Sequence, residues 1–185
     1  MGAAEVHAGA AQVLGFWFAM TPEQHFAKSE WLDAEIAERF GVLRNTVLAS
    51  EAKGWRDDPE TLLAAIILLD QFSRNVHRGT AGAFAADALA LELTLEAIGK
   101  GWDGGMTGDW LQFLYMPLMH AEDREMQRMS VEKFGALGDA YILGFARSHA
   151  EVIEKFGRFP SRNAALGRDS TPEEREYLSQ PGAGW

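Results

Sequence analysis

The chain has 185 residues, a net charge of −10 at neutral pH and no cysteine. Its length and its 47% of apolar residues are typical of a folded domain with its own core, so wholesale disorder is excluded. The lack of cysteine excludes a disulfide framework, a thiolate metal site and a cysteine nucleophile, and the acidic balance argues against binding to nucleic acids.

Helix signals fill the first half of the chain. The segment Thr21-Pro22-Glu23-Gln24 places a hydroxyl group before a helix and proline in its first position, which is the capping-box pattern. A helical apolar period then predicts a helix that reaches about residue 52, with Gly54 after its end. Its members are Leu32, Ile36, Phe40, Leu43 and Val47. Asp58 begins the next helix, and its apolar run from Leu62 to Leu69 is expected to be covered on every side.

The second half continues in the same way. Apolar residues in alternating steps of four and three predict a helix at about 81–99, followed by a glycine-rich turn at 101–108. Thr107 is expected to cap the following helix, and Pro117 to kink or end it. Residues 139–156 form another amphipathic helix. A long irregular stretch at 157–169 leads to Thr171-Pro172, which begins the last helix.

No run of residues shows the alternation of apolar and polar side chains that is typical of a half-buried strand. The sequence therefore predicts an all-α protein with about seven or eight helices in one domain, residues 1–185. Short connections favour antiparallel helical hairpins in a degenerate array. No secretory leader and no apolar segment of about 20 residues are found, so we expect a cytoplasmic protein that does not associate with membranes.

General catalytic motifs are absent from the sequence. It contains no metalloprotease, phosphate-loop, dinucleotide-binding or serine-hydrolase pattern. The five histidines are dispersed, and none is paired four residues from another. We therefore predict no metal site and no cofactor.

A first group of polar residues directly follows the apolar run. Its predicted ligand-binding members are Gln71, Arg74, Asn75 and Arg78. Asp70, Arg74 and Arg78 are spaced by four and share one helix face if the helix continues. Two interpretations of this group stay open. The first is structural, an internal ion pair between Asp70 and Arg74. The alternative is a pair of forked cations that receives a carboxylate or a phosphate.

Two further candidates are histidines. His120 lies three residues before Asp123, with Gln127 one turn further, and a carboxylate that orients an imidazole is the arrangement of a general base. The same pair also satisfies a buried histidine in a purely structural role. His149 lies between Phe145 and Val152 on an apolar stripe, and it is either a core residue or a ligand-binding one.

A basic loop is the fourth candidate. From Lys155 to Arg168 the chain has four cations and no acid, although the whole protein is acidic. Its predicted ligand-binding residues are Arg158, Arg162, Asn163 and Arg168. Such a reversal of charge faces either an anionic guest or the protein's own acids, and Glu173 and Glu174 are the nearest acids of the last helix.

Taken together, these segments resemble the uncharacterised bacterial family named domain of unknown function 924 over nearly the whole chain. The matching stretches are Phe16-Trp17-Phe18, residues 69–75, Arg78-Gly79-Thr80, Asp87 with Ala90-Leu91, residues 113–117 with His120, Glu122 and Asp123, residues 156–160, Arg162-Asn163 and Leu166-Gly167-Arg168. The resemblance implies a fold similar to tetratricopeptide-repeat superhelices and implies no particular activity. Ser73 stands where the family usually has proline, and Ser161 where it usually has histidine.

Three functions remain possible from the sequence. The first is a binding protein that holds a small anionic molecule or a peptide terminus in a groove lined by arginine, histidine and asparagine. The second is a metal-independent hydrolase or transferase with His120 as the base and Asp123 as the group that orients it. The third is a scaffold whose polar groups only hold helices together. The sequence does not define an oligomeric state.

Overall fold

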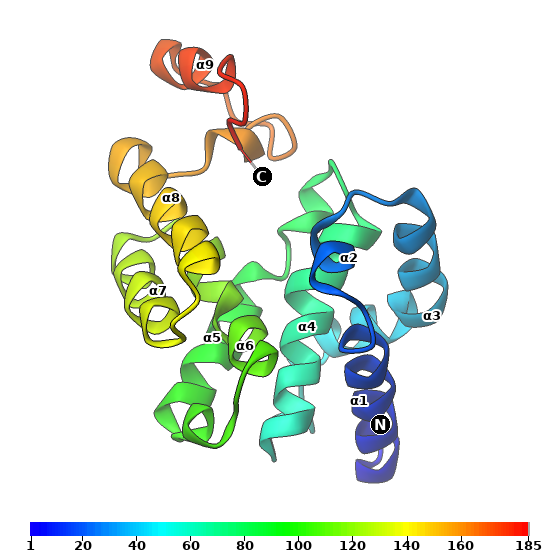
Figure 1. Ribbon diagram of the computed structural model, residues 1–185. Helices are drawn as coiled ribbons and strands as arrows, with labels where there is room; N and C mark the ends of the chain where they lie inside the picture. Colours follow the sequence, from blue (N-terminus) through cyan, green and yellow to red (C-terminus); the bar gives the residue numbers. More distant parts are fainter. Residues whose placement is uncertain (185) are drawn as a thin grey trace. The chain divides into compact units, whose positions relative to one another are not determined.

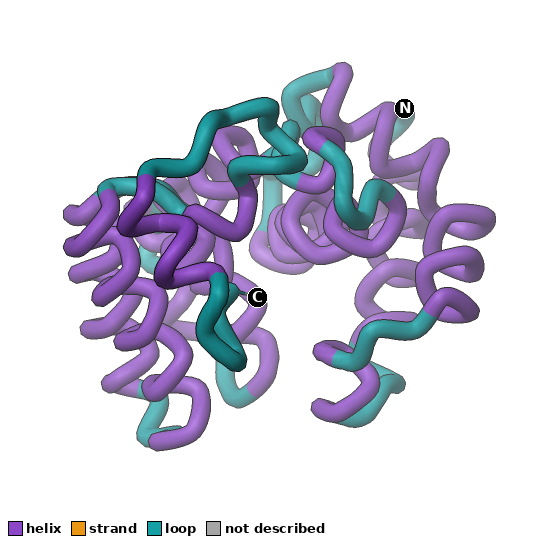
Figure 2. The backbone as a smooth tube through the Cα atoms, turned by 90° about the horizontal axis from the view of Figure 1, so that it is seen from above, coloured by secondary structure: helices purple, strands orange, loops and turns teal. Residues whose placement is uncertain are grey.

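The computed structural model describes residues 1–184, and these residues form helices and loops without a strand (Figures 1 and 2). The all-α prediction is confirmed. The helices are α1 (Ala3–Trp17), α2 (Pro22–Phe26), α3 (Glu30–Ala49), α4 (Pro59–Val76), α5 (Asp87–Gly99), α6 (Asp109–His120), α7 (Arg124–Ala136), α8 (Ala140–Phe156) and α9 (Pro172–Leu178). Short 3-10 turns are η1 (Ala81–Ala83), η2 (Trp102–Gly105) and η3 (Pro160–Arg162).

The chain divides into two compact units. Unit 1 consists of Met1–Arg78 and Gly82–Pro117, and unit 2 consists of residues 79–81 and the chain from residue 118 onward. The division falls inside α6, directly after Pro117. The prediction of a single domain stays a prediction.

Helix α4 is the centre of unit 1. Each residue from Leu62 to Leu69 has an exposed fraction of 0%, as expected for a helix that is apolar on all sides. Helices α1, α3 and α5 pack against it (Figure 1). Trp17 and Trp55 are also fully buried in this unit. Packing of apolar surface around α4 therefore supplies the main core of unit 1.

Three predicted helix starts are confirmed by their caps. Thr21 and Thr171 both form capping boxes, each with proline in the first turn. The Asp58 carboxylate accepts hydrogen bonds from the backbone N–H groups of Glu60 and Thr61, both at 3.0 Å. These side chains satisfy N–H groups that have no partner within the helix.

Several predicted helix ends were wrong. Helix α3 ends at Ala49, because Glu51 and Ala52 adopt positive φ angles of 52° and 56° and turn the chain before Gly54. The helix predicted at 81–99 begins only at Asp87, since residues 81–83 form a 3-10 turn.

Helix α6 also differs from the prediction. It begins at Asp109 rather than directly after Thr107, because Gly108 between them has a φ of 55°, outside the helical range. The helix continues through Pro117 to His120, so the proline does not end it. A proline inside a helix removes one backbone hydrogen bond, and the buried residues around Pro117 compensate for that loss.

Unit 2 is built on the antiparallel pair of α7 and α8, which lie side by side (Figure 1). A short connection at 137–139 joins them, as the prediction of helical hairpins requires. The chain then passes through η3 and a loop to α9. Val152, Ile153 and Phe159 form a small buried cluster, against which Phe156 and Tyr177 pack.

No helix within residues 1–184 is both long enough and apolar enough to span a membrane.

Candidate functional site

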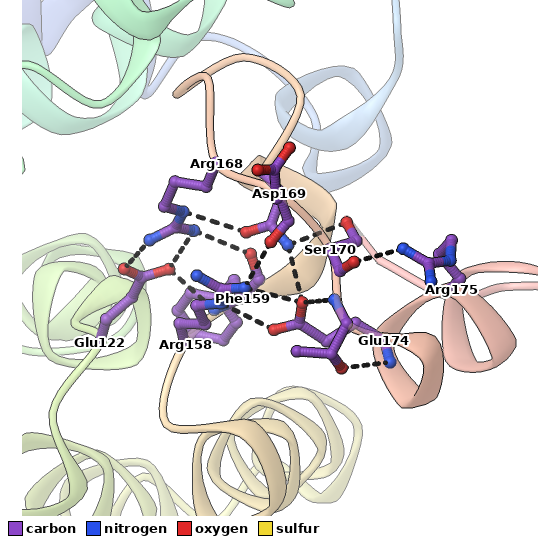
Figure 3. Close-up of polar contacts among 10 residues, drawn as sticks. Glu122, Arg158, Phe159, Arg168, Asp169, Ser170, Glu174 and Arg175 are labelled. Atoms are coloured by element: carbon purple, nitrogen blue, oxygen red, sulfur yellow. Dashed lines mark hydrogen bonds and ion pairs between the residues drawn. The ribbon is translucent and has the colours of Figure 1, made fainter.

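The basic loop of unit 2 is held by ion pairs with two buried or half-buried acids (Figure 3). Arg158 donates from Nε and Nη2 to both carboxylate oxygens of Glu174, at 2.7 and 2.8 Å. Glu174 has an exposed fraction of only 2%, and it also accepts from the backbone N–H of Thr171. The suggestion that an acid of the last helix pairs with this loop is therefore confirmed for Glu174.

Arg168 forms a second forked pair in the same loop. Its two terminal nitrogens donate to the two carboxylate oxygens of Glu122, at 2.7 and 2.9 Å. Its Nε donates to Oδ1 of Asn163 at 3.0 Å, and Asn163 in turn donates to Glu174 at 3.1 Å. Asn163 is 1% exposed, and its two hydrogen bonds join the two ion pairs into one network.

The two acids of this network are strongly biased toward their charged form. Hydrogen bonds from Arg158 lower the pKa of Glu174 to about 2, against the opposing effect of burial. Burial acts against the charge of Glu122 as well, but hydrogen bonds from Arg168 and from the backbone N–H of Phe159 outweigh it and lower the pKa of this carboxyl. Both ion pairs are therefore fully charged at neutral pH.

Arg162 and the two predicted histidines lie around Phe159. The guanidinium of Arg162 covers the Phe159 ring, with its Cζ 4.6 Å from the ring centre, and its Nη2 donates to the backbone carbonyl of His120 at 2.9 Å. The His120 and His149 rings are 6.2 Å apart, and the His149 ring is 5.4 Å from that of Phe159. Unit 2 thus contains six of the predicted ligand-binding or catalytic residues, namely His120, His149, Arg158, Arg162, Asn163 and Arg168.

His149 also has a structural contact of its own. It is 5% exposed, and its Nδ1 lies 2.8 Å from the carbonyl oxygen of Phe145, one turn earlier in α8. That contact orients the ring within its helix. The apolar stripe on which the sequence places His149 is partly exposed to solvent, because Phe145 is 39% exposed.

The expected pairing of His120 with Asp123 on one helix face was based on a wrong helix boundary. Helix α6 ends at His120, and Asp123 is the N-cap of α7. The Asp123 carboxylate accepts from the N–H groups of Glu125 and Met126, at 2.8 and 2.9 Å. Gln127, placed on the same face by its spacing, is instead 2% exposed and donates to the carbonyl groups of Met119 and Ala121.

In unit 1, Arg74 is bound to two aspartates. It forms a forked pair with Asp87 of α5, at 2.9 and 3.0 Å, and its Nη1 lies 3.0 Å from Oδ1 of Asp70. The structural interpretation of Asp70 and Arg74 is thus supported by an ion pair. Gln71 is 8% exposed and donates to the other Asp70 oxygen at 2.5 Å.

Asn75 and Arg78 converge on Asp33 of α3. Asn75 donates to its Oδ1 at 2.7 Å, and Arg78 donates to both oxygens, at 2.6 and 2.7 Å. These contacts, together with those of Arg74, connect α4 to α3 and α5. The four predicted ligand-binding residues of unit 1 therefore all have partners within the protein. The sequence analysis did not identify one of these partners, Asp33.

Asp33 and Glu122 were missed as partners of predicted site residues. Asp33 lies in the first turn of α3, where acids are common because they favour the positive end of the helix dipole, so nothing marked it as unusual. Glu122 is adjacent to Asp123 in a short loop, and only the second of these acids was selected. In the part of the chain that the structure describes, no group of three or more histidine or acidic side chains could hold a metal ion.

The comparisons with known proteins agree with this architecture. Residues 13–182 match the model of a family described as bacterial protein of unknown function, DUF924. The chain belongs to this family. The solved structure of a protein of unknown function from Agrobacterium tumefaciens is similar to this chain, with 40% sequence identity and a TM-score of 0.88, and the match covers 94% of this chain and 98% of that one. No curated protein matches. Membership in DUF924 thus accounts for the fold and assigns no activity.

Proposed function

We propose that this DUF924 protein binds a small anionic ligand in unit 2, beside Arg162, His120 and His149. The ligand class is a compound with a carboxylate or phosphate group, or the carboxyl end of a peptide. One observation carries the proposal, namely that the Arg162 guanidinium lies over the Phe159 ring, next to two imidazole rings. The N–H groups of a guanidinium lie in its plane, and together with its positive charge they are the groups that recognise carboxylate and phosphate oxygens.

The electrostatics of the surrounding loop support an anion. Three arginines and two histidines lie together here in a protein of net charge −10, and the carboxylates of Glu174 and Glu122 pair with Arg158 and Arg168. A local surplus of positive charge in an acidic protein attracts small anions more than large polyanions. Arg162 and His120 are both half-buried, so that an ion pair formed there is less screened by water than one on the surface.

Arg158, Arg168 and Asn163 have a different role in this proposal. Their hydrogen bonds to Glu122 and Glu174 fix the backbone on either side of Arg162, and they act as positioning residues. Preorganisation of this kind lowers the entropic cost of binding, because the loop need not be ordered by the ligand.

The alternative enzymatic function has less support. The predicted partner of His120, Asp123, uses its carboxylate to cap α7. A scaffold without a ligand is favoured by the forked ion pairs of Arg158 and Arg168, and it is the competing outcome in the test of the proposal.

The test is thermal unfolding of the full chain with inorganic phosphate, with a tetrapeptide that has a free carboxyl end, and with the same peptide as its amide. We expect one of the two anions to raise the Tm along a saturating curve, and the amide to have no effect. Arg162→Met removes the fork while keeping the apolar stem over Phe159, so we expect it to abolish the shift.

Arg128→Met serves as the control, because Arg128 is an exposed arginine of α7 in the same unit. It should retain the response of the wild type. If Arg162→Met folds and responds like the wild type, or if neither anion shifts the Tm, the binding proposal is wrong. Loss of the native circular dichroism spectrum in Arg162→Met, together with a wild type that does not respond, would establish the scaffold.

We also propose that the protein acts in the cytoplasm and that its helical pairs follow a tetratricopeptide-like plan. The lack of cysteine supports a reducing compartment, and the antiparallel pair of α7 and α8 supports such a plan in unit 2. Fractionation of cells that produce the tagged chain tests the location.

A further inference from the structure

Unit 1 contains a buried cation whose partners are neutral. Arg44 of α3 is 4% exposed. Its Nε donates to the hydroxyl oxygen of Ser73 at 2.9 Å, and its Nη1 donates to Oδ1 of Asn45 at 3.0 Å. Within the described residues, no hydrogen bond or ion pair joins Arg44 to an aspartate or a glutamate. Its positive charge is therefore not balanced by a carboxylate, in contrast to Arg74 and Arg78 of the same unit.

One end of this guanidinium has no acceptor at all. Nη2 of Arg44 is buried and lacks a hydrogen-bond partner in the described structure. An arginine side chain stays protonated in proteins, so burial does not remove the charge. Burying a charge without a counter-ion is strongly unfavourable, and native proteins avoid it by pairing the charge or by binding an ion.

The groups next to Arg44 are hydrogen-bond donors. The Ser73 hydroxyl is 0% exposed and accepts from Arg44, so its own proton is directed elsewhere. The Asn45 oxygen also accepts from Arg44, which leaves the amide N–H groups of Asn45 as donors. His77 follows Ser73 by one helical turn, and burial together with the positive charge of Arg44 lowers the pKa of its ring. The surroundings of Arg44 thus favour the binding of an anion.

We propose that Arg44, with the Ser73 hydroxyl and the Asn45 amide, is a binding site for a small monovalent anion in unit 1. A single charge is required because one guanidinium is to be neutralised, and a divalent anion would leave a buried negative charge. A small ion is required because Nη2 is sheltered and Ser73 is fully buried. This site is separate in sequence and in partners from the one proposed in unit 2, and neither proposal depends on the other.

Chloride is the probe for this site. The full chain is unfolded thermally while sodium chloride replaces sodium gluconate at constant ionic strength, since gluconate is too bulky to reach a sheltered guanidinium. We expect the Tm of the wild type to rise along a saturating curve, as for any ligand that binds only the folded state. Arg44→Met should give a flat response. A wild type that does not respond to chloride would overturn the proposal.

A control variant separates this site from other effects of salt. Arg147→Met changes an exposed arginine of α8 and should keep the chloride response of the wild type. An Arg44→Met variant with the response of the wild type would also overturn the proposal. If Arg44→Met does not fold, Ser73→Ala and Asn45→Ala are compared by line broadening of the chloride NMR signal, which we expect each to reduce several-fold. Unchanged broadening in both would count against the site.

Discussion

The charge of Arg44 has an energetic consequence for the folded state. When chloride is absent, the guanidinium is held by two neutral acceptors and has a buried nitrogen without a partner. A buried and uncompensated charge destabilises a fold, and replacing it by an apolar side chain of similar length removes that cost. Arg44 is thus a residue at which a substitution in the core is expected to stabilise the protein.

We expect Arg44→Met to increase the free energy of unfolding in gluconate buffer by about 1–3 kcal/mol. In saturating chloride the gain should shrink, because the wild type alone is stabilised by the ion. Urea unfolding followed by circular dichroism measures both values. A variant that is less stable than the wild type in gluconate would contradict the idea that the charge is uncompensated.

At the level of single residues, the sequence indicated which side chains are polar and unusual but not where their partners are. Glu174 was expected near the basic loop because it follows that loop by a few residues. Asp33 lies 42 residues before Asn75 and 45 before Arg78. The contact between them depends on how α3 packs on α4, and no local pattern encodes it.

Among the elements, the short helix α9 depends most on polar contacts. Its Glu174 accepts the forked pair from Arg158 and a hydrogen bond from Asn163. Its Tyr177 is half-buried and packs on Phe156. The ion pair therefore contributes a large share of the free energy that holds α9 in place.

Arg158→Met is expected to loosen α9, because the nearly buried Glu174 carboxylate loses its cation. Hydrogen exchange of the α9 amides should become faster, while exchange in α7 should be unchanged. Arg158→Lys keeps the charge without the fork and should give an intermediate rate. Arg128→Met, in α7, is the matched control. If the α9 amides exchange at the same rate in Arg158→Met and in the wild type, apolar packing holds α9 in place without the ion pair.

The helices themselves were largely predictable, and their ends were not. Caps such as Thr21 and Asp58 are local signals and were correct. The end of α3 depends on two non-glycine residues, Glu51 and Ala52, with positive φ angles, and such a turn has no composition signal. The break between α6 and α7 was overlooked because Asp123 was considered as a catalytic residue and not as a cap.

For the molecule as a whole, acid stability follows from its ion pairs. The pKa of Glu174 falls from 4.5 to about 2 in the folded state, and Glu122 and Asp33 also have lowered pKa values in their pairs with arginine. A carboxyl with a lowered pKa contributes stability above its unfolded value, and that contribution is lost as the pH falls toward the folded value. The protein should therefore lose stability mainly between about pH 4.5 and pH 2.

Glu174→Gln tests this relation. The variant should be less stable than the wild type at pH 7, because Arg158 loses its charged partner, and its stability should fall less steeply below pH 4.5. Urea unfolding from pH 7 to pH 2 gives both curves. Parallel curves would mean that Glu174 does not titrate with folding, and the cause of the acid sensitivity would then lie in other carboxyl groups.

The candidate site was predicted as a set of residue types, and the structure explains why its organisation was not. Of the five predicted ligand-binding arginines, Arg74, Arg78, Arg158 and Arg168 each form a forked pair with an acid of the protein. A sequence alone does not show which arginines form ion pairs with acids of the same protein. The distinction requires the position of acids such as Asp33 and Glu122, which only the packing of helices defines.

The distribution of tryptophan has a spectroscopic consequence. Trp17 and Trp55 are fully buried, and residues 17, 31, 55, 102 and 110 of the six tryptophans all belong to unit 1. Indole emission is therefore dominated by unit 1, whereas far-ultraviolet dichroism monitors helices of both units. Coincident transitions by the two signals would mean that the units melt as one cooperative block, and separated transitions would mean that each melts alone.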